Sequence, residues 1–92
     1  MIYVDYLEKY PNAKEPFKNG SCHLFSDNFE DNTELIDFAE DIGLKFKWIH
    51  LGTFPHFDLT SWMRKQAIQK GAKEVTTSEM VKIYKGHMRS KK

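Results

Sequence analysis

One amphipathic segment between two strand-like runs constrains the fold of this chain most strongly. Residues 31–43 carry apolar side chains at the i, i+3, i+4, i+7 spacing of one helix face, and Gly43 is suited to end the helix. The runs on either side, CHLFSD at 22–27 and FKWIHL at 46–51, are rich in the apolar and aromatic residues typical of strands. A strand–helix–strand unit favours parallel pairing of its two strands, and so predicts an α/β fold.

Similar patterns and turn residues divide the rest of the chain into further elements. They are a strand at 2–7, a loop at 8–20, a short extended piece at 56–59, a helix from Thr60 or Ser61 to about Lys70, a short strand at 73–76, and a helix that starts with a capping box of Thr76 and Glu79. We therefore predict a single α/β domain at residues 1–88, with a small mixed, mostly parallel sheet of about four strands and three helices, followed by a frayed basic tail at 89–92.

The composition argues against several classes of protein. The net charge of +1 gives no strong signature of duplex-DNA binding. The single cysteine, Cys22, excludes an internal disulfide and is predicted to be buried in the second strand. No apolar stretch approaches the roughly 18 residues needed to span a membrane, and the N-terminus lacks the pattern of a signal peptide. We therefore expect a soluble protein of the cytoplasm.

The stretch TFPHFDLT, residues 53–60, is the strongest candidate for a site. Its proline favours an extended backbone, in which alternate side chains point to opposite sides. Phe57 and Leu59 would then face the core, while His56 and Asp58 would face a cleft. Imidazole and carboxylate groups are suited to general acid–base chemistry, so His56 and Asp58 are the candidate catalytic residues. In the alternative interpretation both are structural: Asp58 caps the turn or the second helix, and His56 bonds the backbone or packs.

Other polar residues lie at the ends of the predicted strands and at the start of the second helix. If the second and third strands pair in parallel, Asp27 and His50 meet at the edge of the sheet where open α/β folds bind ligands. Thr60 and Arg64 could hold an anion such as phosphate, or could simply be a cap and an exposed side chain. The candidate ligand-binding residues are Asp5, His23, Asp27, Thr60 and Arg64.

A divalent metal could bind among these side chains, but their spacing does not favour one. No CxxC pair and no HExxH motif is present, so the metal ligands and any other cofactor stay unassigned. The side chains of suitable type are His50, His56 and Asp58, with Asp5 or Asp27.

Charges separate along the chain. The helix at 31–42 is acidic, and from Lys82 onward every charged residue is basic. This pattern is typical of a solvated helix face and a basic tail, or of a surface that recognises a charged partner. The second interpretation gives an alternative function, in which the chain is a non-catalytic accessory protein that binds a host protein through its acidic helix 31–42 or an aromatic surface.

Several short motifs, taken in order, resemble one known family. The motifs are, in order, YVD near the N-terminus, CHLFSD, ELIDFAEDIGLKFKW and HFDLTSWMRKQAIQKGAKEV. Over residues 2–76 the chain thereby resembles a small family known as domain of unknown function 4031, which is found in bacteria and many of their phages. The resemblance implies a shared set of polar residues. The positions that match the family pattern are Asp5, Cys22, His23, Asp27, Trp48, His56, Asp58, Arg64 and Gly71.

Two positions depart from that pattern, because Tyr6 replaces the second aspartate of YVDD and Phe57 replaces the tyrosine of HYD. The resemblance implies no established activity and leaves the reaction open. We expect a cytoplasmic protein of a bacterial or phage-infected cell, whose polar His/Asp cleft binds or hydrolyses a phosphate-bearing ligand such as a nucleotide or a nucleic-acid end. The alternative is the accessory protein described above, encoded by a phage and acting without catalysis.

Overall fold

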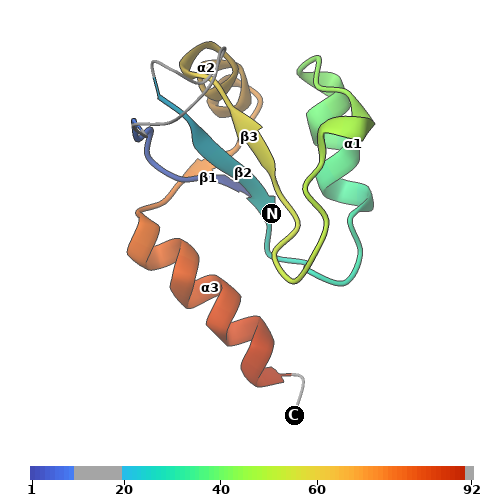
Figure 1. Ribbon diagram of the computed structural model, residues 1–92, viewed down its shortest axis with the longest axis vertical. Coiled ribbons are helices and arrows are strands. Elements are labelled where there is room, and N and C mark those ends of the chain that lie inside the picture. The colour runs from blue at the N-terminus through green and yellow to red at the C-terminus, as the bar shows by residue number, and fades with distance from the viewer. Residues whose placement is uncertain (10–19, 91–92) are drawn as a thin grey trace.

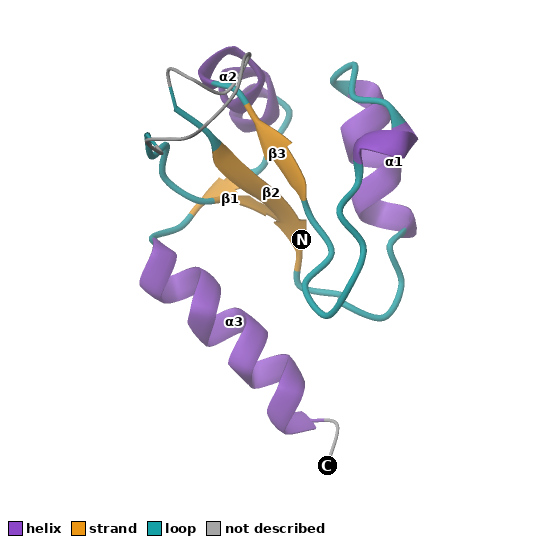
Figure 2. Ribbon diagram, in the orientation of Figure 1, coloured by secondary structure: helices purple, strands orange, loops and turns teal. Residues whose placement is uncertain are grey.

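A small sheet with helices on both faces forms the protein, and the computed structural model describes residues 1–9 and 20–90 (Figures 1 and 2). The predicted loop at 8–20 lies largely outside these residues. In chain order the elements are β1 (Ile2–Val4), β2 (Cys22–Ser26), α1 (Thr33–Asp41), the 3₁₀ helix η2 (Phe46–Trp48), β3 (Phe57–Leu59), α2 (Ser61–Gln69), β4 (Lys73–Glu74) and α3 (Thr77–Ser90).

The sheet has the strand order β3-β2-β1-β4 and is mostly antiparallel. Strand β2 pairs antiparallel with both β1 and β3, and only β1 and β4 pair in parallel. The prediction of a mixed α/β domain with a four-stranded sheet is confirmed, whereas the prediction of mostly parallel pairing is wrong. After α1, the chain passes through residues 42–56 before it rejoins the sheet as β3, which runs antiparallel to β2.

The predicted strand at 46–51 is also wrong. Part of this run forms η2, in which Phe46 and Trp48 are 57% and 44% exposed. Phe46 and Trp48 therefore do not form the buried face that a strand at this position would need. Strand β3 occupies the edge of the sheet instead. A buried residue at each of its ends flanks a half-buried one, which is the pattern of a strand with one buried face.

The two faces of the sheet carry separate apolar clusters. One face packs against α1 and α2 through buried residues that include Val4, Leu24, Leu35, Phe57 and Ala67. The opposite face packs against α3 through Phe25, Phe29, Val75 and the half-buried Met80, Ile83 and Tyr84. In Figure 1, α1 and α2 lie to the right of and above the sheet, and α3 extends below it.

Helix α3 includes Arg89 and Ser90, the first half of the predicted basic tail, while residues 91–92 lie outside the described part of the chain. Within the residues that the structure describes, no helix combines the length and the apolar composition needed to cross a membrane.

The predicted capping box at the start of α3 is confirmed. The Glu79 backbone N–H donates to Thr76 Oγ1 at 3.0 Å, and the Thr76 backbone N–H donates to Glu79 Oε1 at 2.9 Å. Replacing Thr76→Ala removes an acceptor for a free helix N–H, so we expect the melting temperature to fall by about 4–8 °C in a calorimetric scan. The exposed Ser78→Ala is the matched control and should change it little. Equal melting temperatures for both variants would contradict a stabilising cap.

Candidate functional site

A buried carboxylate at the end of β1 orients a histidine on β2. Asp5 is 4% exposed, and its Oδ1 accepts a hydrogen bond of 2.6 Å from the backbone N–H of His23. Asp5 Oδ2 lies 2.9 Å from His23 Nδ1. An ionised carboxylate can only accept a hydrogen bond, so Nδ1 of His23 carries the hydrogen. In the neutral ring, Nε2 of His23 is then the nitrogen that can accept a hydrogen bond. Antiparallel pairing of β1 with β2 brings these residues together.

A second group forms where the chain enters β3. The backbones of His50 and His56 exchange hydrogen bonds of 2.8 and 3.2 Å, which close the intervening turn and stack the two imidazoles at 4.9 Å. Asp58 contacts both rings, with Oδ2 3.0 Å from His50 Nε2 and Oδ1 3.5 Å from His56 Nε2. His56 Nδ1 donates to the backbone carbonyl of Phe54 at 2.8 Å, so the predicted backbone contact of this histidine is present as well.

The two groups meet across β2 and β3. His23 is the register partner of Asp58, and its ring lies 5.0 Å from the ring of His56. We call the five side chains Asp5, His23, His50, His56 and Asp58 the His/Asp cluster. Its members range from the buried Asp5 to His50, whose side chain is 58% exposed, so the cluster extends from the sheet to solvent.

His56 and Asp58 stabilise each other's charged forms. The contact with His56 lowers the pKa of Asp58, and the charges of the neighbouring histidines lower it further against the opposing effect of burial. Burial by itself lowers the pKa of His56, but its contacts with Asp58 and with the Phe54 carbonyl outweigh that effect and raise it. The pair therefore favours an imidazolium on His56 beside an ionised carboxylate on Asp58.

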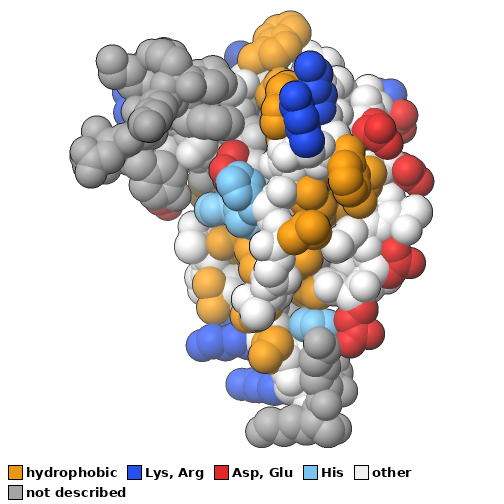
Figure 3. All heavy atoms as spheres, turned by 45° about the vertical axis from the view of Figure 1, so that its right-hand side comes forward, with side chains coloured by type: hydrophobic (Ala, Val, Ile, Leu, Met, Phe, Trp, Pro, Cys, Tyr) orange, Lys and Arg blue, Asp and Glu red, His pale blue; other side chains and the backbone are white. Residues whose placement is uncertain are grey.

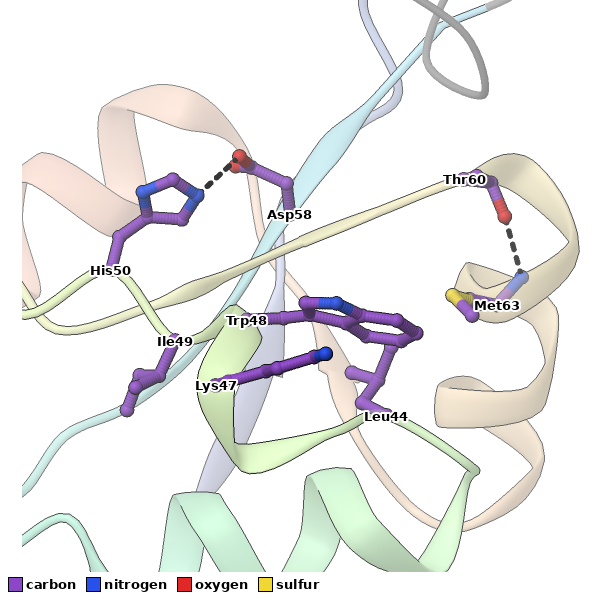
Figure 4. Close-up of a pocket in the computed structure, with 8 residues that line it drawn as sticks. All are labelled: Leu44, Lys47, Trp48, Ile49, His50, Asp58, Thr60 and Met63. Atoms are coloured by element: carbon purple, nitrogen blue, oxygen red, sulfur yellow. Dashed lines mark hydrogen bonds and ion pairs between the residues drawn. The ribbon is translucent and has the colours of Figure 1, made fainter.

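A groove of about 650 Å³ lies beside the edge strand β3, next to the cluster (Figure 4). Trp48 from η2 lies across it, with the Lys47 side chain alongside, and the ammonium group of Lys45 lies 5.6 Å from the centre of the Trp48 ring. His50 and Asp58 belong both to the groove and to the cluster. The other lining residues are Leu44, Ile49, Thr60 and Met63.

Of the seven residues predicted to be catalytic or ligand-binding, the structure brings together four, namely Asp5, His23, His56 and Asp58. His50, which the sequence analysis considers as a possible metal ligand, lies with them. Phe57 and Leu59 are buried on the opposite side of β3, as the alternation in TFPHFDLT predicts. Sequence reasoning missed Lys47 and Met63 as groove residues. The alternation of basic and aromatic residues at 45–48 is the signal for an exposed groove wall, although the apolar residues at 46–51 favour a strand.

Asp27 lies outside the cluster. It follows the far end of β2, where its Oδ1 forms an ion pair of 3.2 Å with the N-terminal amine of Met1. The expected meeting of Asp27 with His50 depended on parallel pairing, and antiparallel pairing places the end of β2 beside the start of β1 instead.

Thr60 and Arg64 have structural contacts. Thr60 Oγ1 caps α2 by accepting from the Met63 backbone N–H at 3.3 Å. Arg64 Nε donates to the Asp5 carbonyl at 3.0 Å, and its Nη2 lies 3.2 Å from Glu74 Oε1. The guanidinium group therefore ties α2 to the ends of β1 and β4, while Thr60 still lines the groove.

The chain belongs to the family described as "Protein of unknown function (DUF4031)", whose model matches residues 2–87. This range includes the whole His/Asp cluster and the groove, and it confirms the resemblance drawn from the short motifs. No curated protein and no solved structure matches the chain at a significant level of similarity.

Cys22 is next to His23 in the chain but points into the core, where it is 2% exposed. Burial, together with the charge of Asp5, raises the pKa of its thiol to about 12, against a smaller opposing effect of Arg64. The thiol is then almost entirely un-ionised at pH 8. We expect a disulfide reagent to label the native protein at pH 8 far more slowly than the protein unfolded in guanidinium chloride. Comparable rates in both states would contradict the burial of Cys22.

Proposed function

We propose that this member of an uncharacterised family binds a nucleotide, or the phosphate-bearing end of a nucleic acid, in the groove beside β3 and hydrolyses a phosphate ester at the His/Asp cluster. The observation that carries the proposal is the position of Asp58. One carboxylate oxygen contacts His50 and the other contacts His56, so a single residue connects the cluster to the groove.

His50 is the residue best suited to accept a proton. Its Nε2 lies 3.0 Å from Asp58, which leaves Nδ1 as the ring nitrogen that accepts a proton, and its ring is the most exposed of the cluster. A carboxylate that orients an imidazole in this way is a common feature of general bases. His56 has both ring nitrogens engaged, with Asp58 and with the Phe54 carbonyl, so we assign proton transfer to His50 instead.

Trp48 and its neighbouring lysines favour a ligand that has both a flat ring and a phosphate. Stacking of a base on an exposed aromatic side chain contributes about 1–3 kcal/mol, and lysine binds phosphate as a point charge. Trp48 lies in the groove with Lys47 beside it, and Figure 3 shows histidine and hydrophobic side chains on a common face of the molecule. A base on Trp48 would bring its phosphate within the same groove as His50.

The proposed step is an attack by water on phosphorus. The oxygen of the water molecule bonds to phosphorus while the bond from phosphorus to the leaving oxygen breaks. His50 Nδ1 takes a proton from the water, and the leaving oxygen takes one from solvent. Asp58 keeps the imidazole in the required tautomer and stabilises the imidazolium ion that forms.

The first test measures phosphate release from nucleoside monophosphates and from a short phosphorylated oligonucleotide, with and without added divalent cations. The His50→Gln variant lacks the proposed general base, so its kcat should be lower than that of the unmodified protein by about 100-fold or more. Trp48→Ala should mainly raise KM, because it removes a stacking surface and no reacting group. The control is Trp62→Ala, since Trp62 is 67% exposed on α2 and does not line the groove. No turnover of any of these substrates, or equal turnover by His50→Gln, would contradict the proposal.

A second candidate function is partner binding without catalysis, and the exposed carboxylates of α1 favour it. Leu35 and Ala39 face the core, while Asp37, Glu40 and Asp41 are exposed. Figure 3 shows acidic side chains along one edge of the surface. Such a row of like charges suits a basic protein surface.

This second function predicts that charge reversal at α1 abolishes capture of a basic partner from a bacterial lysate. The test variant is Asp37→Lys combined with Asp41→Lys, and the matched control is His50→Gln, which leaves the helix unchanged. Capture by the control but not by the double variant would favour this function over hydrolysis. Equal capture by both variants would remove it.

A further inference from the structure

We propose that His23, His56 and Asp58 bind a divalent transition-metal ion, with Zn²⁺ as the best match, at the centre of the His/Asp cluster. This inference goes beyond the proposed function and does not depend on it. One ligand atom from each of the three residues lies within 4.8 Å of the other two. Ligands of a tetrahedral zinc ion lie about 3.3 Å apart, and the His56 Nε2 to Asp58 Oδ1 distance of 3.5 Å is already close to that value.

Each proposed ligand has its own outer partner. Asp5 accepts from Nδ1 of His23, and the Phe54 carbonyl accepts from Nδ1 of His56. With hydrogen on Nδ1, each imidazole has its Nε2 left to bind a metal ion, once that nitrogen carries no proton. Metal-ligating histidines almost always donate their other N–H to a carboxylate or a backbone carbonyl, and this arrangement is present at both histidines.

Asp58 is oriented in the same way from the opposite side. Its Oδ2 is held at 3.0 Å by His50 Nε2, and its Oδ1 faces His56. His50 is therefore an outer partner of the carboxylate and not a ligand, which changes the ligand set considered from the sequence. His23 takes the place of His50, because the register of β2 and β3 places His23 opposite Asp58.

The ligand types favour a borderline metal. Two imidazoles and one carboxylate suit zinc and its transition-metal neighbours, whereas Mg²⁺ and Ca²⁺ prefer oxygen ligands throughout. Three protein ligands leave one position of a tetrahedral site for water, which is typical of catalytic zinc sites. The side chains of the three residues are between 21% and 34% exposed, so an ion can reach them from solvent.

The binding test is a calorimetric titration of the chelator-treated protein with Zn²⁺, together with a thermal scan. We expect one ion per chain and, at about a hundred times the dissociation constant, a rise in melting temperature of about 10 °C or more. Co²⁺ should give the visible absorption of a tetrahedral site. No heat, no thermal shift and no cobalt absorption would overturn the proposal.

Variants separate the ligands from their outer partners. His23→Gln, His56→Gln and Asp58→Asn should each abolish the thermal shift, whereas Asp5→Asn and His50→Gln should weaken binding about 10–100-fold. The matched control is His87→Gln, which removes the one imidazole outside the cluster and should leave binding unchanged. Loss of binding in His87→Gln, or full binding in His23→Gln, would overturn the assignment.

A measurement on the unmodified chain guards against variants that fail to fold. Nitrogen-15 spectra of the imidazoles should show that Zn²⁺ shifts Nε2 of His23 and His56 to the position of a metal-bound nitrogen, while Nδ1 of both rings stays protonated. A metal-bound Nδ1, or no shift at either ring, would contradict the proposed geometry. Zinc binding without any phosphate release would leave this site in place and remove only the proposed hydrolysis.

Discussion

A buried carboxylate joins the strands and orients the site at the same time. Asp5 is 4% exposed and accepts two hydrogen bonds from His23, one from its backbone and one from its ring. Without such partners, burial of an ionised carboxylate would cost on the order of several kcal/mol. The Asp5 carbonyl also accepts from Arg64, so one residue connects β1, β2 and α2. A change that disturbs Asp5 therefore affects both the fold and the orientation of the first histidine.

The register of β2 and β3 extends this arrangement across the sheet. Cys22 and Leu24 pair with Leu59 and Phe57 on the buried side, which leaves the intervening pair of His23 and Asp58 on the other face. A slip of one residue would turn His23 and Asp58 into the core and expose their apolar neighbours. The hydrophobic core thus specifies the contacts of the cluster, although no cluster residue belongs to the core clusters of the sheet.

The sequence predicts the elements that depend on local patterns. The helices near 33–41 and 61–69, the capping box at Thr76 and the alternation through TFPHFDLT all depend on side chains a few residues apart, and all are present. The direction of pairing depends instead on how the chain returns after each helix, which a local pattern does not record. The run at 46–51 has strand-like residues, but burial decides between a strand and a 3₁₀ helix, and burial is a tertiary property.

The same distinction explains which site residues could be anticipated. His56 and Asp58 are two apart in an extended segment, so their common side follows from the chain itself. The proximity of His23 to them requires the β2–β3 register, and the exclusion of Asp27 requires the antiparallel β1–β2 pair. Asp27 follows the end of β2 that lies away from the cluster, and four residues of extended chain separate it from His23 by about 13 Å.

The two departures from the family pattern lie outside the cluster. Tyr6 is 51% exposed, is not one of the five cluster side chains, and has its ring 5.8 Å from the Arg64 guanidinium. Phe57 is 1% exposed on the buried side of β3, opposite His56 and Asp58. A phenol at that position would need a buried partner for its hydroxyl, whereas phenylalanine needs none. Both substitutions are therefore compatible with an intact arrangement of His23, His56 and Asp58.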